Sequence, residues 1–247
     1  MTPYVVILAL GLTPARSEPE SVSQLLKRLR CAPQVKNLLR EWNASNEVLR
    51  APPGIDGQGR YRISTARLGV WITVENPSSP FEPVRLFRTE AWSGTSVELD
   101  GSCNPTFTEL PGLSATELEN GFTDRDLERL LAAKDRLVVF LWSPHLPLSV
   151  EGYGEIVAAV SELGIPLAAV VDPSAVPELV EEVSERNGIP LEARRVLASV
   201  ELLFRDLAVH APTVLFFWRG KAEAPLPGYR DRKAYMEFFE RVTARHH

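Results

Sequence analysis

The sequence is poor in cysteine, in runs of positive charge and in long apolar segments. Its 247 residues include two cysteines, Cys31 and Cys103, which lie too far apart for a redox pair or a pattern of zinc ligands. Lysine and arginine are scattered through a chain of net charge −5, which argues against a broad nucleic-acid-binding surface. The longest apolar segment at the N-terminus is too short to span a bilayer comfortably.

The remaining composition is that of a folded, soluble protein. Hydrophobic residues make up 45% of the chain and charged residues 24%, which is typical of globular rather than disordered proteins. The length allows one large domain or two of ordinary size. Twenty prolines fit a protein with many fixed turns.

Residues 4–12 form the N-terminal apolar segment, and the Thr-Pro-Ala that follows is a small-X-small pattern suited to signal peptidase. Residues 1–16 are therefore a possible signal peptide, which predicts a periplasmic or secreted protein. Because no lysine or arginine precedes the segment, a buried terminal strand and a cytoplasmic location are the alternative. In the exported protein, Cys31 and Cys103 are expected to form a disulfide, whereas in the cytosol they would be two buried thiols.

Residues 20–103 are predicted to form a smaller α+β lobe. Apolar residues recur at helical spacing in two short stretches, and the residues around 61–63, 68–74, 84–88 and 96–99 read as strands. We expect two helices packed on an antiparallel sheet, with a loop at residues 51–59. Residues 104–121, rich in Pro, Gly, Thr and Ser, are predicted to be a linker. No catalytic spacing occurs in this half.

The second half of the chain alternates strand and helix. Residues 136–142 and 167–171 are continuous apolar runs, as expected of strands buried on both faces of a sheet. Each is followed by helical periodicity, and this order predicts a three-layer α/β domain with a right-handed crossover. Thr123 and Asp231 are predicted N-caps of the first and last helices of this half.

The first apolar run ends in Trp142-Ser143-Pro144-His145-Leu146. This segment resembles the Trp-Cys-X-X-Cys signature of thioredoxins, and its Pro-His centre resembles the Cys-Pro-His-Cys form of periplasmic disulfide oxidoreductases. Ser143 and Leu146 stand at the two cysteine positions. Thiol–disulfide exchange needs a thiolate and a second sulfur, so the sequence predicts no such activity.

A second segment resembles the same superfamily. His210-Ala211-Pro212-Thr213, followed by an apolar strand, is similar to the thioredoxin segment in which a cis-proline precedes an antiparallel strand. The resemblance covers residues 122–245 and implies a thioredoxin-like α/β domain, a central mixed sheet flanked by helices. It also implies a cis Ala211–Pro212 bond and a loop that lies against the turn at residues 143–146.

The resemblance further implies where a partner would bind. In thioredoxins the backbone before the cis-proline pairs with an extended substrate segment, which requires no cysteine. The implied binding residues are Trp142, Ser143, Pro144, His145, Leu146, His210, Ala211 and Pro212. We expect a redox-inactive interaction or assembly module of the cell envelope whose partner is another protein or an extended peptide.

Chemistry at this site is the alternative. Ser143 is expected to be a helix cap rather than a nucleophile, because serine is strongly preferred there. His145 and His210 lack a recognisable third ligand, which makes a poor zinc site. No catalytic residue, metal, cofactor or nucleic-acid partner is predicted. An enzyme that uses Ser143 and His145, of the thiol-substrate transferase type, and a decayed structural domain both remain open.

Overall fold

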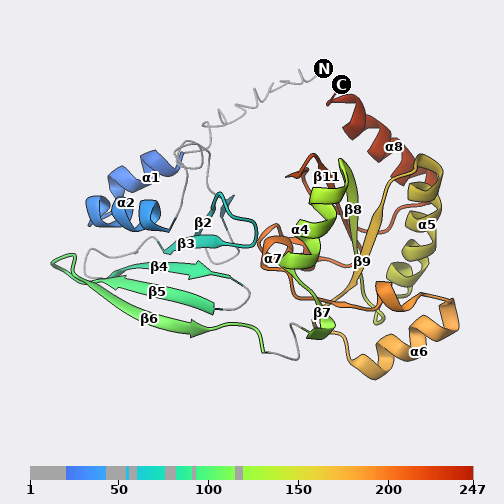
Figure 1. Cartoon of the computed structure of the whole chain (residues 1–247), viewed down its shortest axis with the longest axis horizontal. Coiled ribbons are helices and arrows are strands. Elements are labelled where there is room, and N and C mark those ends of the chain that lie inside the picture. Colours follow the sequence, from blue (N-terminus) through green and yellow to red (C-terminus); the bar gives the residue numbers. More distant parts are fainter. Residues whose placement is uncertain are drawn as a thin grey trace, which may run out of the picture.

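The computed structural model describes residues 21–42, 54–55, 60–75, 82–90, 93–114 and 119–246. The possible signal peptide, residues 1–16, lies outside them. The described chain forms two sheets, one of six strands and one of seven, in two lobes that lie side by side (Figure 1). No described helix is long and apolar enough to cross a membrane.

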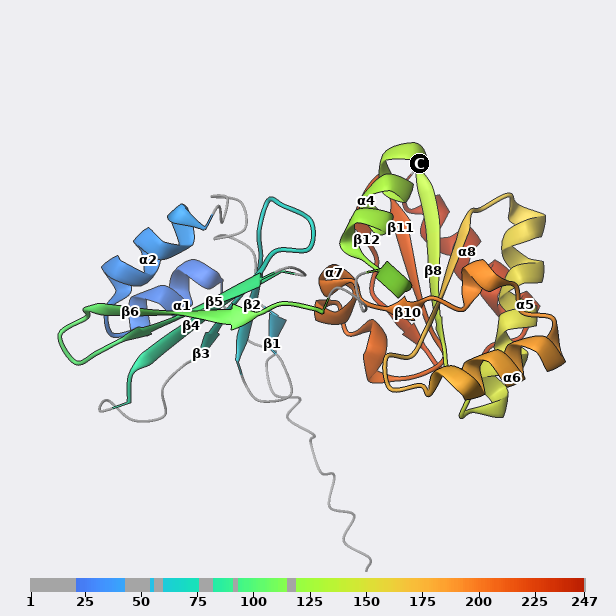
Figure 2. The same cartoon turned by 60° about the horizontal axis from the view of Figure 1, so that its bottom comes forward.

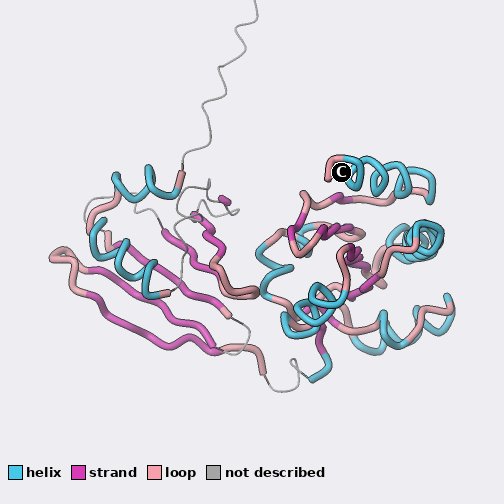
Figure 3. Tube along the Cα trace, turned by 45° about the horizontal axis from the view of Figure 1, so that its top comes forward, coloured by secondary structure: helices cyan, strands magenta, loops and turns pink. Residues whose placement is uncertain are grey.

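The N-terminal lobe is an antiparallel sheet covered by two helices. Neighbouring strands of the sheet are also neighbours in sequence. The strands are β1 (Gly54–Ile55), β2 (Tyr61–Ser64), β3 (Trp71–Glu75), β4 (Val84–Thr89), β5 (Ser93–Leu99) and β6 (Pro105–Pro111). Helices α1 (Val22–Arg28) and α2 (Ala32–Glu41) lie on one face of it (Figure 3). Their apolar sides form one core with alternate strand residues such as Ile72, Leu86 and Val97, which confirms the predicted α+β lobe.

A disulfide between Cys31 and Cys103 joins the helical hairpin to the β5–β6 turn, as predicted. Cys31 has φ 62° and Cys103 has φ 65°, so both occupy the left-handed region. Cys103 ends a three-residue hairpin loop, at the position that glycine usually takes. The bond therefore ties together two tight turns that are distant in sequence.

Three segments of this lobe differ from the sequence-based expectation. Residues 105–111, predicted as part of the linker, form β6 and pair with β5 along their whole length. Most side chains of β6 are exposed, so the segment lacks the apolar alternation that marks a half-buried strand. Strand β3 starts at Trp71 because Gly69, with φ 72°, lies in a turn. Gly54 and Ile55, in the predicted loop, pair with β2.

The C-terminal domain is a mixed sheet flanked by helices (Figure 2). The sheet order is β12-β11-β8-β9-β10-β7, with β13 beside β11. Strand β9 is parallel to β8, and β11 is antiparallel to it. The strands are β7 (Gly121–Phe122), β8 (Arg136–Trp142), β9 (Leu167–Val171), β10 (Val196–Leu197), β11 (Thr213–Trp218), β12 (Lys221–Ala222) and β13 (Leu226–Pro227). This is the predicted thioredoxin-like α/β fold.

Helices cover both faces of this second sheet (Figure 3). The helices are α4 (Asp124–Ala133), α5 (Pro147–Leu163), α6 (Pro177–Asn187), α7 (Val200–Phe204) and α8 (Arg232–Ala244). Residues of α5, α6 and α8 share one core with the sheet, and residues of α4 and α7 share the other. Both predicted N-caps are confirmed, Thr123 for α4 and Asp231 for α8.

None of the elements between α6 and β11 was predicted from the sequence. This stretch contains the short turn of helix η2 (Leu191–Ala193), then β10 and α7, and a second short turn, η3 (Leu207–Val209). In Figures 1 and 2 helix α7 lies at the side of the domain that faces the N-terminal lobe. It makes the contacts between the lobes that are described below.

Candidate functional site

The helix that follows β8 does not begin at Ser143. Helix α5 begins at Pro147, after Leu146 as N-cap, because proline suits the first helical turn, where its missing N–H is not needed. The Ser143 amide donates to Ser149 Oγ at 2.9 Å, and Ser143 is only 1% exposed. The expectation that Ser143 caps the helix is therefore wrong, and its hydroxyl is not presented to solvent as a nucleophile would be.

The predicted binding residues divide into buried and exposed groups. Those with buried side chains are Trp142, Ser143, Pro144 and Pro212. The indole N–H of Trp142 donates to the Ala193 carbonyl at 2.8 Å, so this residue belongs to the core. His145, Leu146 and His210 are exposed and Ala211 is half-buried. Leu148, in the first turn of α5, adds a further large apolar side chain at the surface.

The loop before β11 lies at the same end of the sheet as this turn. The Ala211–Pro212 peptide bond is cis. Thr213 pairs with Leu141 across the sheet, which brings Pro212 next to the end of β8. A Cβ atom added to Gly152 of α5 would lie 3.8 Å from Pro212 Cγ, so α5 packs closely on the loop. The Thr213 hydroxyl donates to the His210 carbonyl, which also holds this loop in place.

The polar side chain that follows β9 at this end of the sheet stabilises a turn. Asp172 Oδ1 accepts from the amide of Ser174 at 2.9 Å and from its hydroxyl at 2.8 Å, which is the hydrogen bonding of an Asx turn. Within the described part of the chain, no group of three His, Cys, Asp or Glu side chains could hold a metal ion. The site therefore offers a ligand the exposed apolar side chain of Leu146, the exposed imidazoles of His145 and His210, and main-chain groups.

A second polar centre, which sequence reasoning missed, lies between the lobes. Glu201 of α7 is 4% exposed and accepts from the Trp71 indole N–H at 2.8 Å and the Gly69 amide at 3.2 Å. Arg205 completes the cluster with an ion pair of 2.6 Å to Glu201. The Phe204 ring lies 5.6 Å from that of Trp71. Helix α7 thus attaches the first sheet to the second domain.

Asp124, at the start of α4, supports this helix from the other side. Its carboxylate accepts from the Ser199 hydroxyl at 2.5 Å and from the amides of Val200 and Glu201 at 3.1 and 2.9 Å. Burial raises the pKa of Asp124, although these hydrogen bonds oppose the shift. A Cβ atom on Gly69 would come within 2.5 Å of Asp124 Oδ2, so the main chain of Gly69 in the first lobe packs directly on the Asp124 side chain of the second domain.

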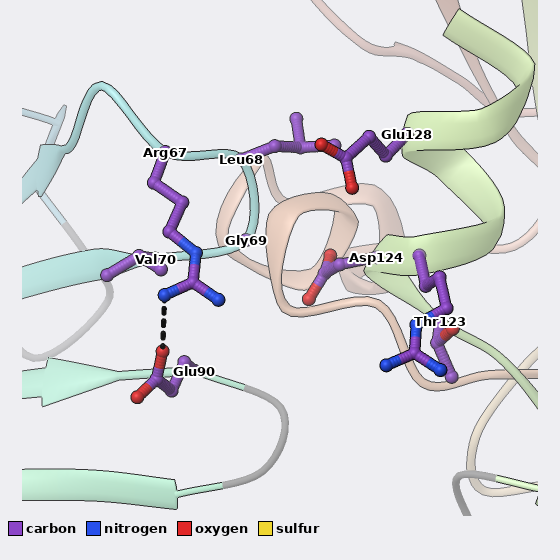
Figure 4. Close-up of a pocket in the computed structure, with 9 residues that line it drawn as sticks. Arg67, Leu68, Gly69, Val70, Glu90, Thr123, Asp124 and Glu128 are labelled. Atoms are coloured by element: carbon purple, nitrogen blue, oxygen red, sulfur yellow. Dashed lines mark ion pairs between the residues drawn. The ribbon is translucent and has the colours of Figure 1, made fainter. Parts of the chain in front are cut away.

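A cavity of about 230 Å³ opens beside this contact, between the β2–β3 turn and the first residues of α4 (Figure 4). Arg67 and Glu90 form an ion pair of 3.7 Å across its rim. Side chains of both charges line it, including Asp124, Arg125 and Glu128. The only sequence signal for this contact is Gly69 inside an alternating apolar pattern, which often marks a close approach of backbones.

No protein-family model matches the chain, and no curated protein matches it. Among solved structures, it is similar to the thioredoxin of Fasciola hepatica, with 19% identity over 48% of this chain and 93% of that chain, at a TM-score of 0.31. The order and direction of the strands place the C-terminal domain in the thioredoxin-like fold.

Proposed function

We propose that the protein is a redox-inactive thioredoxin-like module of the cell envelope that binds another protein through its turn surface. The turn surface consists of His145, Leu146, Leu148, His210 and Ala211. The observation that carries the proposal is the exposure of two leucines there, 44% for Leu146 and 56% for Leu148. Leu146 stands where a thioredoxin would carry its second cysteine.

Clustered apolar side chains at a surface favour a protein partner, because contact with a partner removes them from water. The neighbouring loop adds main-chain groups beside the half-buried Ala211, and strand pairing with such groups needs no reactive side chain. The binding would therefore use contact area and backbone hydrogen bonds in place of a mixed disulfide.

Two features support the redox and compartment parts of the proposal. Both cysteines of the chain belong to one disulfide in the other lobe, so no sulfur is available at the turn for exchange. Structural disulfides persist in oxidising compartments, and residues 1–16 contain an apolar segment and a small-X-small pattern like those of an export signal. The burial of Ser143 counts against an enzyme that uses its hydroxyl.

The test is the double variant Leu146→Ser and Leu148→Ser, captured from mildly cross-linked native cells beside the wild type. We expect the major partner recovered with the wild type to fall about tenfold or more, because each apolar side chain contributes roughly 1 to 3 kcal/mol when buried. Phe107→Ser is the matched control, since Phe107 is 55% exposed and lies on β6 of the N-terminal lobe, outside the turn surface.

Equal recovery of that partner with all three proteins would contradict the proposed surface. The redox part is tested separately with an insulin-reduction assay on the wild type. We expect no turnover above the buffer rate, and turnover comparable to that of a dithiol oxidoreductase would overturn the assignment as redox-inactive.

A further inference from the structure

The outer edge of β9 is largely unpaired in the described structure. Strand β9 pairs with β8 at all five of its residues, but it pairs with β10 only through Val171 and Val196. Both β10 and β7, which complete this side of the sheet, are two residues long. Among the described residues, no strand therefore pairs with the outer edge of residues 167–170.

The direction of the neighbouring hydrogen bonds identifies the groups at this edge. On the inner side, the Val138 amide of β8 donates to the Pro166 carbonyl at 2.9 Å. On the outer side, the Val171 amide donates to the Arg195 carbonyl at 2.9 Å. Alternate residues of a strand face the same neighbour, so the main-chain groups of Leu167 and Ala169 face outward. Such groups require a partner when they are shielded from water.

A cavity of about 450 Å³ runs along the same edge, which is the size of a typical ligand site. Tyr153 and Val157 of α5 line one side, and Phe122 and Leu130 line the other. The edge residues Ala168 and Ala169 also line it, and their small side chains leave room for an added main chain. The cavity thus combines apolar walls with outward-facing amides and carbonyls.

We propose that this cavity, the β9 groove, binds an extended peptide segment of a partner protein by strand addition. The peptide main chain pairs with Leu167 and Ala169, and its alternate side chains contact the two apolar walls. The exposed carboxylate of Glu192 lies at the rim, whereas the charge of Arg195 is matched by Asp126 at 2.7 Å. The rim therefore favours a basic residue beside the apolar ones.

The probe is a fluorescein-labelled peptide, acetyl-Lys-Val-Thr-Val-Thr-Val-Lys-amide, titrated into the full chain and followed by fluorescence polarisation. Two matched peptides carry backbone N-methyl groups, one on the valine amides and the other on the threonine amides. In a strand these two sets of amides face opposite sides. We expect one methylated peptide to bind about ten- to hundredfold more weakly, through its lost hydrogen bonds, and the other to bind nearly as well.

Amide hydrogen exchange locates the site independently. Exchange at Leu167 and Ala169 should slow when the peptide is added, and the double variant Leu146→Ser and Leu148→Ser should bind the peptide unchanged. Val157→Glu, which places a charge in the groove wall, should weaken binding about tenfold. Val176→Glu, which changes an exposed side chain outside the groove, should leave peptide binding unchanged. If Val157→Glu does not fold, the methylated peptides provide the test.

Three results would overturn the proposal. The first is absence of saturable binding at about 1 mM peptide, the weak end of specific association. The second is equal binding of both methylated peptides and the parent peptide, since strand addition requires one set of amides. The third is slow exchange at Leu167 and Ala169 in the free chain that deletion of residues 1–12 makes fast, because the chain's own N-terminal segment would then fill the groove.

Discussion

The two sheets of the molecule are stabilised in different ways. The first sheet packs its main core against helices α1 and α2 on one face and contacts α7 through Trp71, whereas β8 and its neighbours are buried between two helical layers. A one-sided core removes less apolar surface from water. The N-terminal lobe adds a disulfide and a fixed contact with α7, while the second domain depends on packing. The disulfide and the polar contact with α7 should therefore contribute most to stability in the N-terminal lobe.

The largest expected effect comes from removing the disulfide with Cys31→Ser and Cys103→Ser. The two cysteines are 72 residues apart, and a loop of that length corresponds to about 4 kcal/mol in the chain-entropy model. We expect β4 and β5 to lose hydrogen-exchange protection while β8 keeps it. Equal loss in both sheets would contradict the separation of the two cores.

A matched variant sharpens this prediction. Because Cys103 has φ 65°, glycine in its place relieves the left-handed conformation that serine must still adopt. The pair Cys31→Ser and Cys103→Gly should therefore be about 1 kcal/mol more stable than the double serine variant. Urea unfolding under identical conditions measures the difference.

The next effect concerns the contact between the lobes. Gly69→Ala combines a φ of 72° with a Cβ atom within 2.5 Å of Asp124 Oδ2, and should cost about 3 kcal/mol from strain and overpacking together. Gly164→Ala is the control, because its φ is 61° with no atom within 4 Å of the added Cβ. It should cost about 1 kcal/mol. Similar losses of unfolding free energy in both variants would show that Gly69 and Asp124 are not in close contact.

Glu201→Gln should destabilise the protein by about 2 kcal/mol, because the buried carboxylate bonded to Trp71 and Arg205 becomes neutral while its partners stay in place. The control is Glu182→Gln, which breaks an exposed pair with Arg186 on α6 and should cost less than about 0.5 kcal/mol. Urea denaturation of both variants compares them. Equal effects would mean that the contact between the lobes contributes no more than a surface ion pair.

The smallest effect is a dependence on pH with opposite signs at two carboxyl groups of α4. Burial raises the pKa of Asp124, so its stabilising contribution is present below the ordinary carboxyl range and is lost as pH rises through the raised value. For Asp126, burial is outweighed by bonds from Arg195 and Thr123, and its pKa is lowered. Its contribution is present above the ordinary range and is lost as pH falls.

Asp124→Asn and Asp126→Asn separate the two contributions. The stability of the wild type relative to Asp124→Asn should fall as pH rises above about 4, the ordinary carboxyl value, while that relative to Asp126→Asn should fall as pH drops below it. Urea unfolding at several pH values measures both slopes. Slopes of the same sign would contradict the assigned environments.

The sequence predicted what depends on local pattern. Continuous apolar runs identified β8 and β9, Thr123 and Asp231 identified two helix starts, and helical spacing identified α1 and α2. The disulfide followed from the apparent export signal and the presence of two cysteines. These features depend on a few neighbouring residues or on composition, which a single sequence contains.

What the sequence did not predict depends on distant residues or on competing local signals. Gly69 and Glu201 are 132 positions apart, and no local sequence pattern around either residue indicates that the two are in contact. Strand β6 is exposed along most of its length, so only its pairing with β5 identifies it. Ser143 is a good capping residue by type, but the helix begins one turn later, at Pro147, because proline suits the first helical turn.

The central claim is that the turn surface contacts a protein partner, and site-specific photocross-linking tests it most directly. A benzoylphenylalanine residue placed at Leu148 and irradiated in native cells should give one defined protein adduct, and the same residue at Phe107 on β6, which is also exposed, should not give that adduct. The adduct should persist under reducing conditions, because the proposed contact involves no sulfur. The same adduct at equal yield from both positions, or no adduct at Leu148, would contradict the account.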